Sequence, residues 1–363
     1  MTLRNIIIAT LAVAATTVCG AQTSQKITAG KANEYGLVYT LPQTALDIYI
    51  EAEVTESHPG QFYNYARRHL GITDAVTDDS RSARVTGAII VPRGIPDPGK
   101  RYTAQFKPGQ TAYILLTDND MPMAINAEAG SSDDAPAIPA ARPAAPSPLE
   151  GEAARQAVTA EMARSASVSK KAELAAQRIF ELRETRSDIL SGQADNPPAD
   201  GDAMKLVLDN LAAQEAALTA MFAGTTSTRT EVRRYTLVPD SSDISGRVIA
   251  RLSAVDGLVD ADNLAGSPIT VDLKVIEQGM LPVNEKGEVK TFPKGGVAYN
   301  IPGSAAVSVS FDGSQIASGQ FPLAQLGIVF GINPALFTDR KAPYKAIFDT
   351  TTGAVTELAP MTE

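Results

Sequence analysis

The chain has 363 residues, with 41 acidic against 32 basic side chains and a formal net charge of −9. This acidic balance argues against nucleic acid as a partner, because duplex binding draws most of its affinity from Lys and Arg on phosphates. The length is ample for two domains with separate cores.

Residues 1–21 are predicted to be a secretory signal peptide and not part of the fold. Arg4 gives a positive start, residues 6–18 form an apolar run, and Cys19-Gly20-Ala21 offers small residues to a signal peptidase. We expect cleavage before Gln22, in preference to lipidation of Cys19, because the residues before Cys19 do not fit a lipidation motif.

That cleavage would leave a mature chain without cysteine, since Cys19 is the only one. Disulfides, thiol catalysis and cysteine-based zinc sites are then excluded. No later apolar run reaches the ~20 residues that a spanning helix needs, so no transmembrane span is predicted.

Residues 22–128 are predicted to form an N-terminal antiparallel β domain with one short helix. Apolar and polar residues alternate over 46–54, which indicates a half-buried strand with Asp47 on its wet face. The short helix is expected over 59–71. Further strands are expected at 36–39, 83–91, 102–106 and 112–116, with turns at 94–99 and 118–120.

Residues 129–147 change in composition to Ala, Pro, Ser and Asp, with prolines at 136, 139, 143 and 146. Such a segment has little apolar surface to bury. It is predicted to be an extended, mobile linker.

Residues 148–224 are predicted to form a long antiparallel helical hairpin. Ser147-Pro148 is a typical helix start, and the three serines around Ser167 predict a break there. The first arm has its apolar face at Ala172, Ala175, Ile179, Leu182 and Ile189, and the second at Met204, Val207, Leu211, Leu218 and Met221.

We expect these two faces to pack against each other and against the chain's own β domain. A partner helix or a second copy of the chain is the alternative. Leu211, at the centre of the second face, is expected to be intramolecular core, and any docking role is expected on the outer face near Arg183 and Arg186.

Residues 225–363 return to strand patterns, which predict a C-terminal β-sandwich of immunoglobulin-like proportions. The predicted fold class is therefore α+β. The strands are expected at 230–238, 244–252, 269–275, 296–301, 305–311, 315–322, 328–330, 344–348 and 354–358.

Several stretches resemble a family of exported proteins of unknown function from Bacteroides-type bacteria. They are the entry 34–39, the segment 59–66, the hairpin text 178–186 with 198–201, and the closing 348–355. The resemblance covers nearly the whole mature chain and implies export and this order of parts. It implies no activity and nominates no functional residue.

The residues that could carry chemistry have simpler structural explanations. His58 and His69 are interpreted as surface residues rather than a metal or catalytic pair. Ser167-Val168-Ser169-Lys170 fits the S-x-x-K pattern of penicillin-interacting enzymes, but no Ser-Asp-Asn or Lys-Thr-Gly accompanies it. Asp256, Asp260, Asp262 and Asn263 lack the spacing of an EF-hand loop.

The sequence therefore nominates no catalytic, cofactor-binding or metal-binding residue, and no cofactor is expected. It favours an exported, non-catalytic protein of the periplasm or outer membrane that binds another envelope protein or a second copy of itself. A glycan or small-ligand binder and a cysteine-free hydrolase that uses paired carboxylates are the alternatives. The absence of Trp, a common stacking platform for sugars, argues against carbohydrate work.

Overall fold

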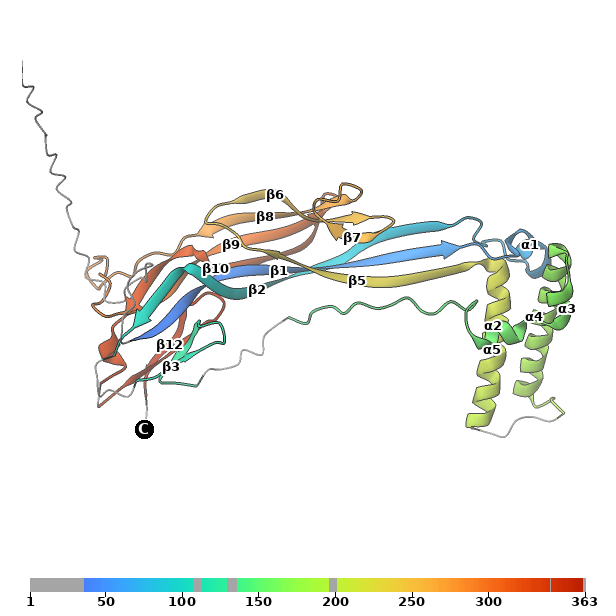
Figure 1. Ribbon diagram of the computed structural model, residues 1–363, viewed down its shortest axis with the longest axis horizontal. Helices are drawn as coiled ribbons and strands as arrows, with labels where there is room; N and C mark the ends of the chain where they lie inside the picture. Colours follow the sequence, from blue (N-terminus) through green and yellow to red (C-terminus); the bar gives the residue numbers. More distant parts are fainter. Residues whose placement is uncertain (1–35, 107–111, 129–135, 196–200, 340, 362–363) are drawn as a thin grey trace, which may run out of the picture.

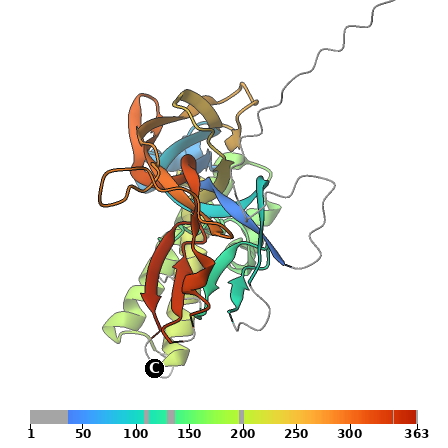
Figure 2. The ribbon, with the colours of Figure 1, turned by 90° about the vertical axis from the view of Figure 1, so that its left-hand side faces the viewer.

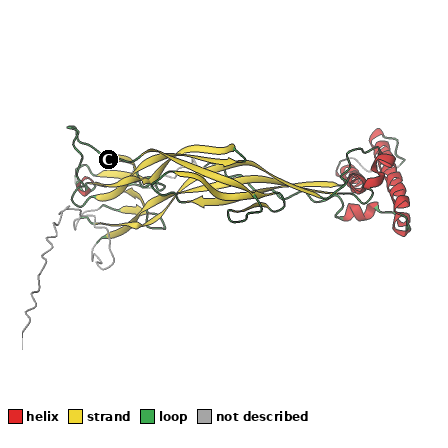
Figure 3. Ribbon diagram, turned by 90° about the horizontal axis from the view of Figure 1, so that it is seen from above, coloured by secondary structure: helices red, strands yellow, loops and turns green. Residues whose placement is uncertain are grey.

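The computed structural model describes residues 36–106, 112–128, 136–195, 201–339 and 341–361. The predicted signal peptide and the cleavage before Gln22 lie outside these residues. The described chain is mainly β-structure in antiparallel sheets, with a smaller set of helices, as the sequence predicts at this level. Figure 3 shows all the longer helices gathered at one end of a long molecule, with strands and one short helical turn in the rest.

Three parts follow one another along the molecule (Figure 1). The body holds the second and third sheets and most of the first. The neck is the part of the first sheet that extends beyond the body as a three-stranded ribbon. The head is the group of helices at the far end of the neck. The neck consists of residues 53–58, 80–86 and 225–232. No helix in the described ranges is both long enough and apolar enough to cross a membrane.

The first sheet runs through both body and neck. Its strands are β1 (Leu37–His58), β2 (Ser80–Ala104) and β5 (Thr225–Leu237), in the order β2-β1-β5. The predicted alternation is confirmed in β1, where Leu46, Ile48, Ile50, Ala52 and Val54 are all buried. Asp47 was expected on a wet face and is buried instead.

Two predicted interruptions are absorbed into these strands. Pro42 does not end a short strand. β5 pairs with β1 only from Leu46 onward, so Pro42 has no neighbouring strand on the β5 side and its missing N–H breaks no hydrogen bond there. The predicted turn at 94–99 lies within β2. There the register shifts so that Thr40 faces Arg101 while Pro42 faces Pro96, and the extra residues of β2 form a bulge.

The second sheet has the order β10-β9-β8-β6-β7, and the third has the order β12-β11-β4-β3. Figure 2, seen from the body end, shows β3 and β4 in green beside β11 and β12 in red. The short η2 (Pro334–Leu336) follows β10. The strands are β3 (Ile114–Leu116), β4 (Pro122–Ile125), β6 (Ile244–Ser253), β7 (Gly257–Asp260), β8 (Ser267–Glu277), β9 (Val297–Phe311), β10 (Ser314–Ile332), β11 (Tyr344–Phe348) and β12 (Val355–Pro360).

The two predicted β regions, 22–128 and 225–363, share their cores. One apolar cluster joins Ile48 and Ile50 of β1 to Val271 of β8 and Val307 of β9. The third sheet likewise pairs β4 with β11. Strands far apart in the sequence therefore bury their apolar faces against one another, and the body does not divide at the middle of the chain.

The head is built from two separate segments of the chain. Between β1 and β2 lie η1 (Tyr63–Tyr65) and α1 (Ala66–Leu70), which ends at Gly71 with a φ of 70°. Between β4 and β5 lie the predicted linker and four helices. These are α2 (Glu152–Ala157), α3 (Ala160–Arg164), α4 (Val168–Ser191) and α5 (Asp202–Ala223).

The helix break predicted near Ser167 is present, but the predicted start at Ser147-Pro148 is wrong. Ser167 caps α4, and its Oγ accepts a hydrogen bond from the Lys170 N–H at 3.4 Å. Ser147 shapes only a turn, with its Oγ 3.3 Å from the Leu149 N–H, and α2 begins at Glu152.

Candidate interaction surface on the helical head

The head has a hydrophobic core of its own. Residues from η1–α1, α2, α3, α4 and α5 all contribute, and the rings of Phe62 and Phe222 pack at a tilt of 53° with their centroids 5.4 Å apart. The buried set is Phe62, Ala66, Ala157, Met162, Ala172, Ala175, Ala176, Ile179, Leu182, Leu218 and Phe222. An apolar cluster drawn from five separate segments holds these helices as one unit at the end of the neck.

The two predicted apolar faces of the hairpin differ in outcome. On α4, Ala172, Ala175, Ile179 and Leu182 are buried. On α5, Leu218 alone of the five predicted residues is fully buried, Leu211 is half-buried, and Val207 is exposed. The head core contacts only the second half of α5. The core residues of this helix therefore include Phe222, which was not predicted from the sequence, and do not include Val207, which was. The spacing of four between Phe222 and Leu218 was the signal for Phe222.

The last turn of α5 is attached to the connection between β1 and β2. The Phe62 N–H donates to the Met221 carbonyl at 2.6 Å, and the Val76 N–H donates to the Ala223 carbonyl at 2.8 Å. A Cβ added at Gly60 would collide with the Met221 and Ala220 carbonyl oxygens. Gly60 is thus required for the close approach of the two backbones.

Gly60→Ala is therefore expected to destabilise the protein by about 2 kcal/mol, because backbone atoms have little freedom to move away from a new methyl group. The matched control is Gly87→Ala in β2, where an added Cβ has nothing within 4 Å. Thermal melting of both variants checks this prediction. Equal melting temperatures would contradict the close approach at Gly60.

Any docking role was expected near Arg183 and Arg186, and both of these side chains link α4 to α5. Arg183 Nε lies 2.6 Å from Glu215 Oε1, and Arg186 Nη1 lies 3.1 Å from Glu215 Oε2. Both guanidinium groups are thus engaged by one carboxylate of α5. The sequence offered no signal for this pairing, since Glu215 is far from both along the chain.

Large apolar side chains are exposed on the part of α4 and α5 that projects beyond the head core. We call Leu190, Leu206 and Val207 the distal apolar residues; their exposed fractions are 68%, 72% and 37%. Leu206 lies about 27 Å along α5 from its end at Gly224, at 1.5 Å per residue. The two long helices run side by side away from the neck (Figure 1).

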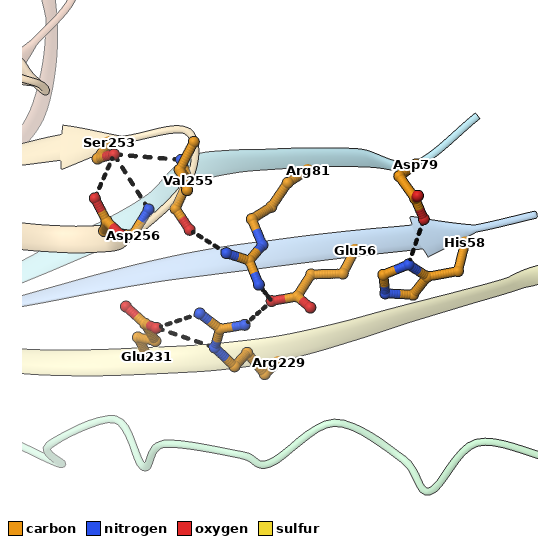
Figure 4. A network of polar contacts seen from close by, with 9 residues as sticks. All are labelled: Glu56, His58, Asp79, Arg81, Arg229, Glu231, Ser253, Val255 and Asp256. Atoms are coloured by element: carbon orange, nitrogen blue, oxygen red, sulfur yellow. Dashed lines mark hydrogen bonds and ion pairs between the residues drawn. The ribbon is translucent and has the colours of Figure 1, made fainter. Parts of the chain in front are cut away.

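The neck is held by polar side chains on both faces. Glu56 binds Arg81 and Arg229, and Arg81 also donates to the Val255 carbonyl at 3.1 Å, which ties the β6–β7 turn to the neck (Figure 4). Hydrogen bonds from Arg229 and Arg81 hold the pKa of Glu56 below its ordinary value. Thr55 and Thr228 are paired through hydroxyl oxygens 3.1 Å apart.

The two histidines contact different groups. His58, at the end of β1, places Nδ1 2.7 Å from Asp79 Oδ1. His69 lies in α1 beside the rings of Tyr65 and Phe222. His58 is consistent with the predicted surface position, whereas the Nε2 of His69 is buried in the head.

The acidic residues around β7 have hydrogen bonds within the turns on either side of that strand. Asp256 accepts a hydrogen bond from Ser253 Oγ at 3.3 Å, and Asn263 Oδ1 accepts one from the Ala265 N–H at 3.1 Å. Within the described residues, no group of three or more His, Cys, Asp or Glu side chains is placed to hold a metal ion.

Two clefts of the body carry no pair of carboxylates. The first, of ≈ 400 Å³, is lined by Gln105, Phe106, Lys294, Asn333, Pro334, Ala335 and Thr338. The second, of ≈ 370 Å³, lies over β8–β10 and has Asp272 as its one acidic residue. Neither offers the two facing carboxylates that glycoside hydrolysis requires.

The buried carboxylate of Asp47 has partners for both of its oxygens. Arg93 Nε lies 2.7 Å from Asp47 Oδ2, and Thr236 Oγ1 donates to Asp47 Oδ1 at 2.6 Å. Burial acts to raise the pKa of Asp47, but the hydrogen bonds from Arg93 and Thr236 outweigh it and leave the pKa below its usual value. The group is thus held as a carboxylate and has a structural role.

Comparison with known proteins gives a family for the chain. No curated protein and no solved structure shows a significant match. The model of a domain of unknown function, DUF4831, matches residues 35–356, which include the body, the neck and the head. Because this match covers most of the sequence, the chain belongs to the DUF4831 family.

Proposed function

We propose that the protein is an exported, non-catalytic component of the cell envelope, in the periplasm or at the outer membrane, and that it binds another protein through its helical head. The observation that carries the proposal is the exposure of the distal apolar residues, with Leu206 at 72% and Leu190 at 68%. Large apolar side chains that stay exposed on a projecting element are a feature of protein interaction sites.

The long shape of the molecule supports this role. The neck places the head at the far end from the body (Figure 1), so a partner could approach α4 and α5 without meeting the sheets. The head also has its own core, which lets it present a rigid surface. The partner is another envelope protein or a second copy of this chain.

A photo-crosslinking side chain at position 206 tests the proposal, with position 264 as the matched control. Leu264 is 82% exposed in the loop between β7 and β8 of the body, so the two positions start from the same residue type and similar exposure. In cells that export the protein, we expect a defined protein adduct from position 206 and none from position 264. No adduct at 206, or the same adducts at both, would contradict it.

A further inference from the structure

The described part of the predicted linker touches the free edge of the neck. Residues 136–147 are extended and follow β5 toward the head (Figure 1). Arg142 and Thr230 form an antiparallel bridge, in which the Arg142 N–H donates to the Thr230 carbonyl at 2.9 Å and the Thr230 N–H donates to the Arg142 carbonyl at 2.8 Å. This segment is thus anchored to the sheet at one residue pair.

The bridge shows which backbone groups of β5 face outward. β5 pairs with β1 without a register shift from Thr225 to Leu237, so residues in the same phase as Thr230 direct their N–H and C=O away from β1. They are Thr226, Thr228, Thr230, Val232 and Arg234. In the described part of the chain, Thr230 alone of these is paired across the edge. The remaining groups form an open edge that another strand can pair with.

In an extended segment, the N–H groups of successive residues point alternately toward and away from the neighbouring strand. The prolines of this segment fall in both of these sets, counted from Arg142, whose N–H points toward β5. In a segment that keeps the alternation set at Arg142, Pro139 and Pro143 have their backbone on the side away from β5, where a missing N–H prevents a further strand from adding. Pro136 and Pro146 fall in the phase that faces β5 and limit any pairing to the residues between them. Residues 138–144, which we call the strap, can therefore lie on β5 but cannot extend the sheet.

The edge beneath the strap is complementary to itself. If two β5 strands pair antiparallel with Thr230 opposite Thr230, Arg229 of each faces Glu231 of the other. Thr228 of each then faces Val232, a pair of β-branched residues of the kind that stabilises adjacent strands. Arg229 and Glu231 already pair within one strand at 3.0 Å, so this register would place two Arg–Glu pairs of opposite orientation side by side without bringing like charges opposite each other. This absence of repulsion and the β-branched pairs favour a second copy of the same chain as the strand that fits here.

We propose that the strap guards the outer edge of β5, and that its release allows two copies of the chain to pair through their β5 strands, centred on Thr230. The strap occupies the central pair of this edge, so the two arrangements exclude each other. This inference concerns the neck and does not depend on the binding role proposed for the head.

The test uses one proline in each phase of the strap. Arg142→Pro removes the N–H that bonds to Thr230 and should release the strap, whereas Ala141→Pro adds a proline where the N–H faces away from β5. Arg142 and Ala141 are both exposed, so neither change should disturb the fold. In sedimentation over a concentration series, we expect Arg142→Pro to reach about twice the mass of the Ala141→Pro variant.

A second change locates the contact. The N–H of Thr230 bonds to Arg142 and not to β1, so Thr230→Pro removes an outward donor without breaking the β1–β5 ladder. Adding it to Arg142→Pro should restore the smaller mass. The proposal is overturned if Arg142→Pro has the mass of Ala141→Pro, if both variants associate equally, or if association survives Thr230→Pro.

Discussion

Leu218→Asp is expected to unfold the helical head and to lower the free energy of unfolding by about 4 kcal/mol or more. Leu218 is completely buried in the head core, so the change removes its packing and places a carboxylate among apolar side chains. A loss of this size is a large part of the ~5–15 kcal/mol that stabilises a typical domain. Circular dichroism during thermal melting should show helix signal lost at a much lower temperature than in the unmodified protein.

Leu211→Asp provides a graded comparison on the same helix. Leu211 is half-buried and packs at the margin of the head core, so its carboxylate can remain partly hydrated, and the expected loss is smaller. The melting temperature should therefore be highest for the unmodified protein, lower for Leu211→Asp and lowest for Leu218→Asp. Equal melting temperatures for all three would mean that α5 does not pack in the head as described.

Arg93→Met is expected to destabilise the body by about 3 kcal/mol at neutral pH. Asp47 is 2% exposed, and removing Arg93 leaves its carboxylate buried with the Thr236 hydroxyl as its remaining side-chain donor. The matched control is Arg84→Met. Arg84 pairs with Glu53 on the exposed neck, where loss of an ion pair usually costs less than about 1 kcal/mol.

Removing Arg93 should also change the pH dependence of stability that comes from Asp47. In the unmodified protein the folded-state pKa of Asp47 is depressed, so its contribution is present above the unfolded-state value and is lost as pH falls through the folded-state pKa. Without Arg93, the largest of the influences that lower this pKa is lost, so the folded-state pKa should rise. The deficit of Arg93→Met should then shrink as pH is lowered through the unfolded-state value near 4.

Urea unfolding of both proteins between neutral and acidic pH measures this. A constant deficit at every pH would show that Arg93 acts through packing and not through the charge of Asp47.

The sequence by itself determined most of the local structure. Strict alternation from Leu46 to Val54 required a strand with one buried face, and the spacing of Ala172, Ala175, Ile179 and Leu182 required a helix with one buried stripe. Ser167 could be recognised as a break because its hydroxyl satisfies a backbone donor a few residues away. These features depend on neighbours within one or two turns, and such interactions are visible in a single sequence.

Only the tertiary structure decided which distant segments meet. The pairing of β4 with β11, the shared core of β1 with β8 and β9, and the engagement of Arg183 and Arg186 by Glu215 all join residues far apart in the chain. Asp47 has the alternation of a wet-face residue, yet β2 and β5 bring Arg93 and Thr236 to it and make its burial tolerable. The alternation of polar and apolar residues determines on which face of the strand a side chain lies. Whether that face is buried depends on the segments that the rest of the chain packs against it.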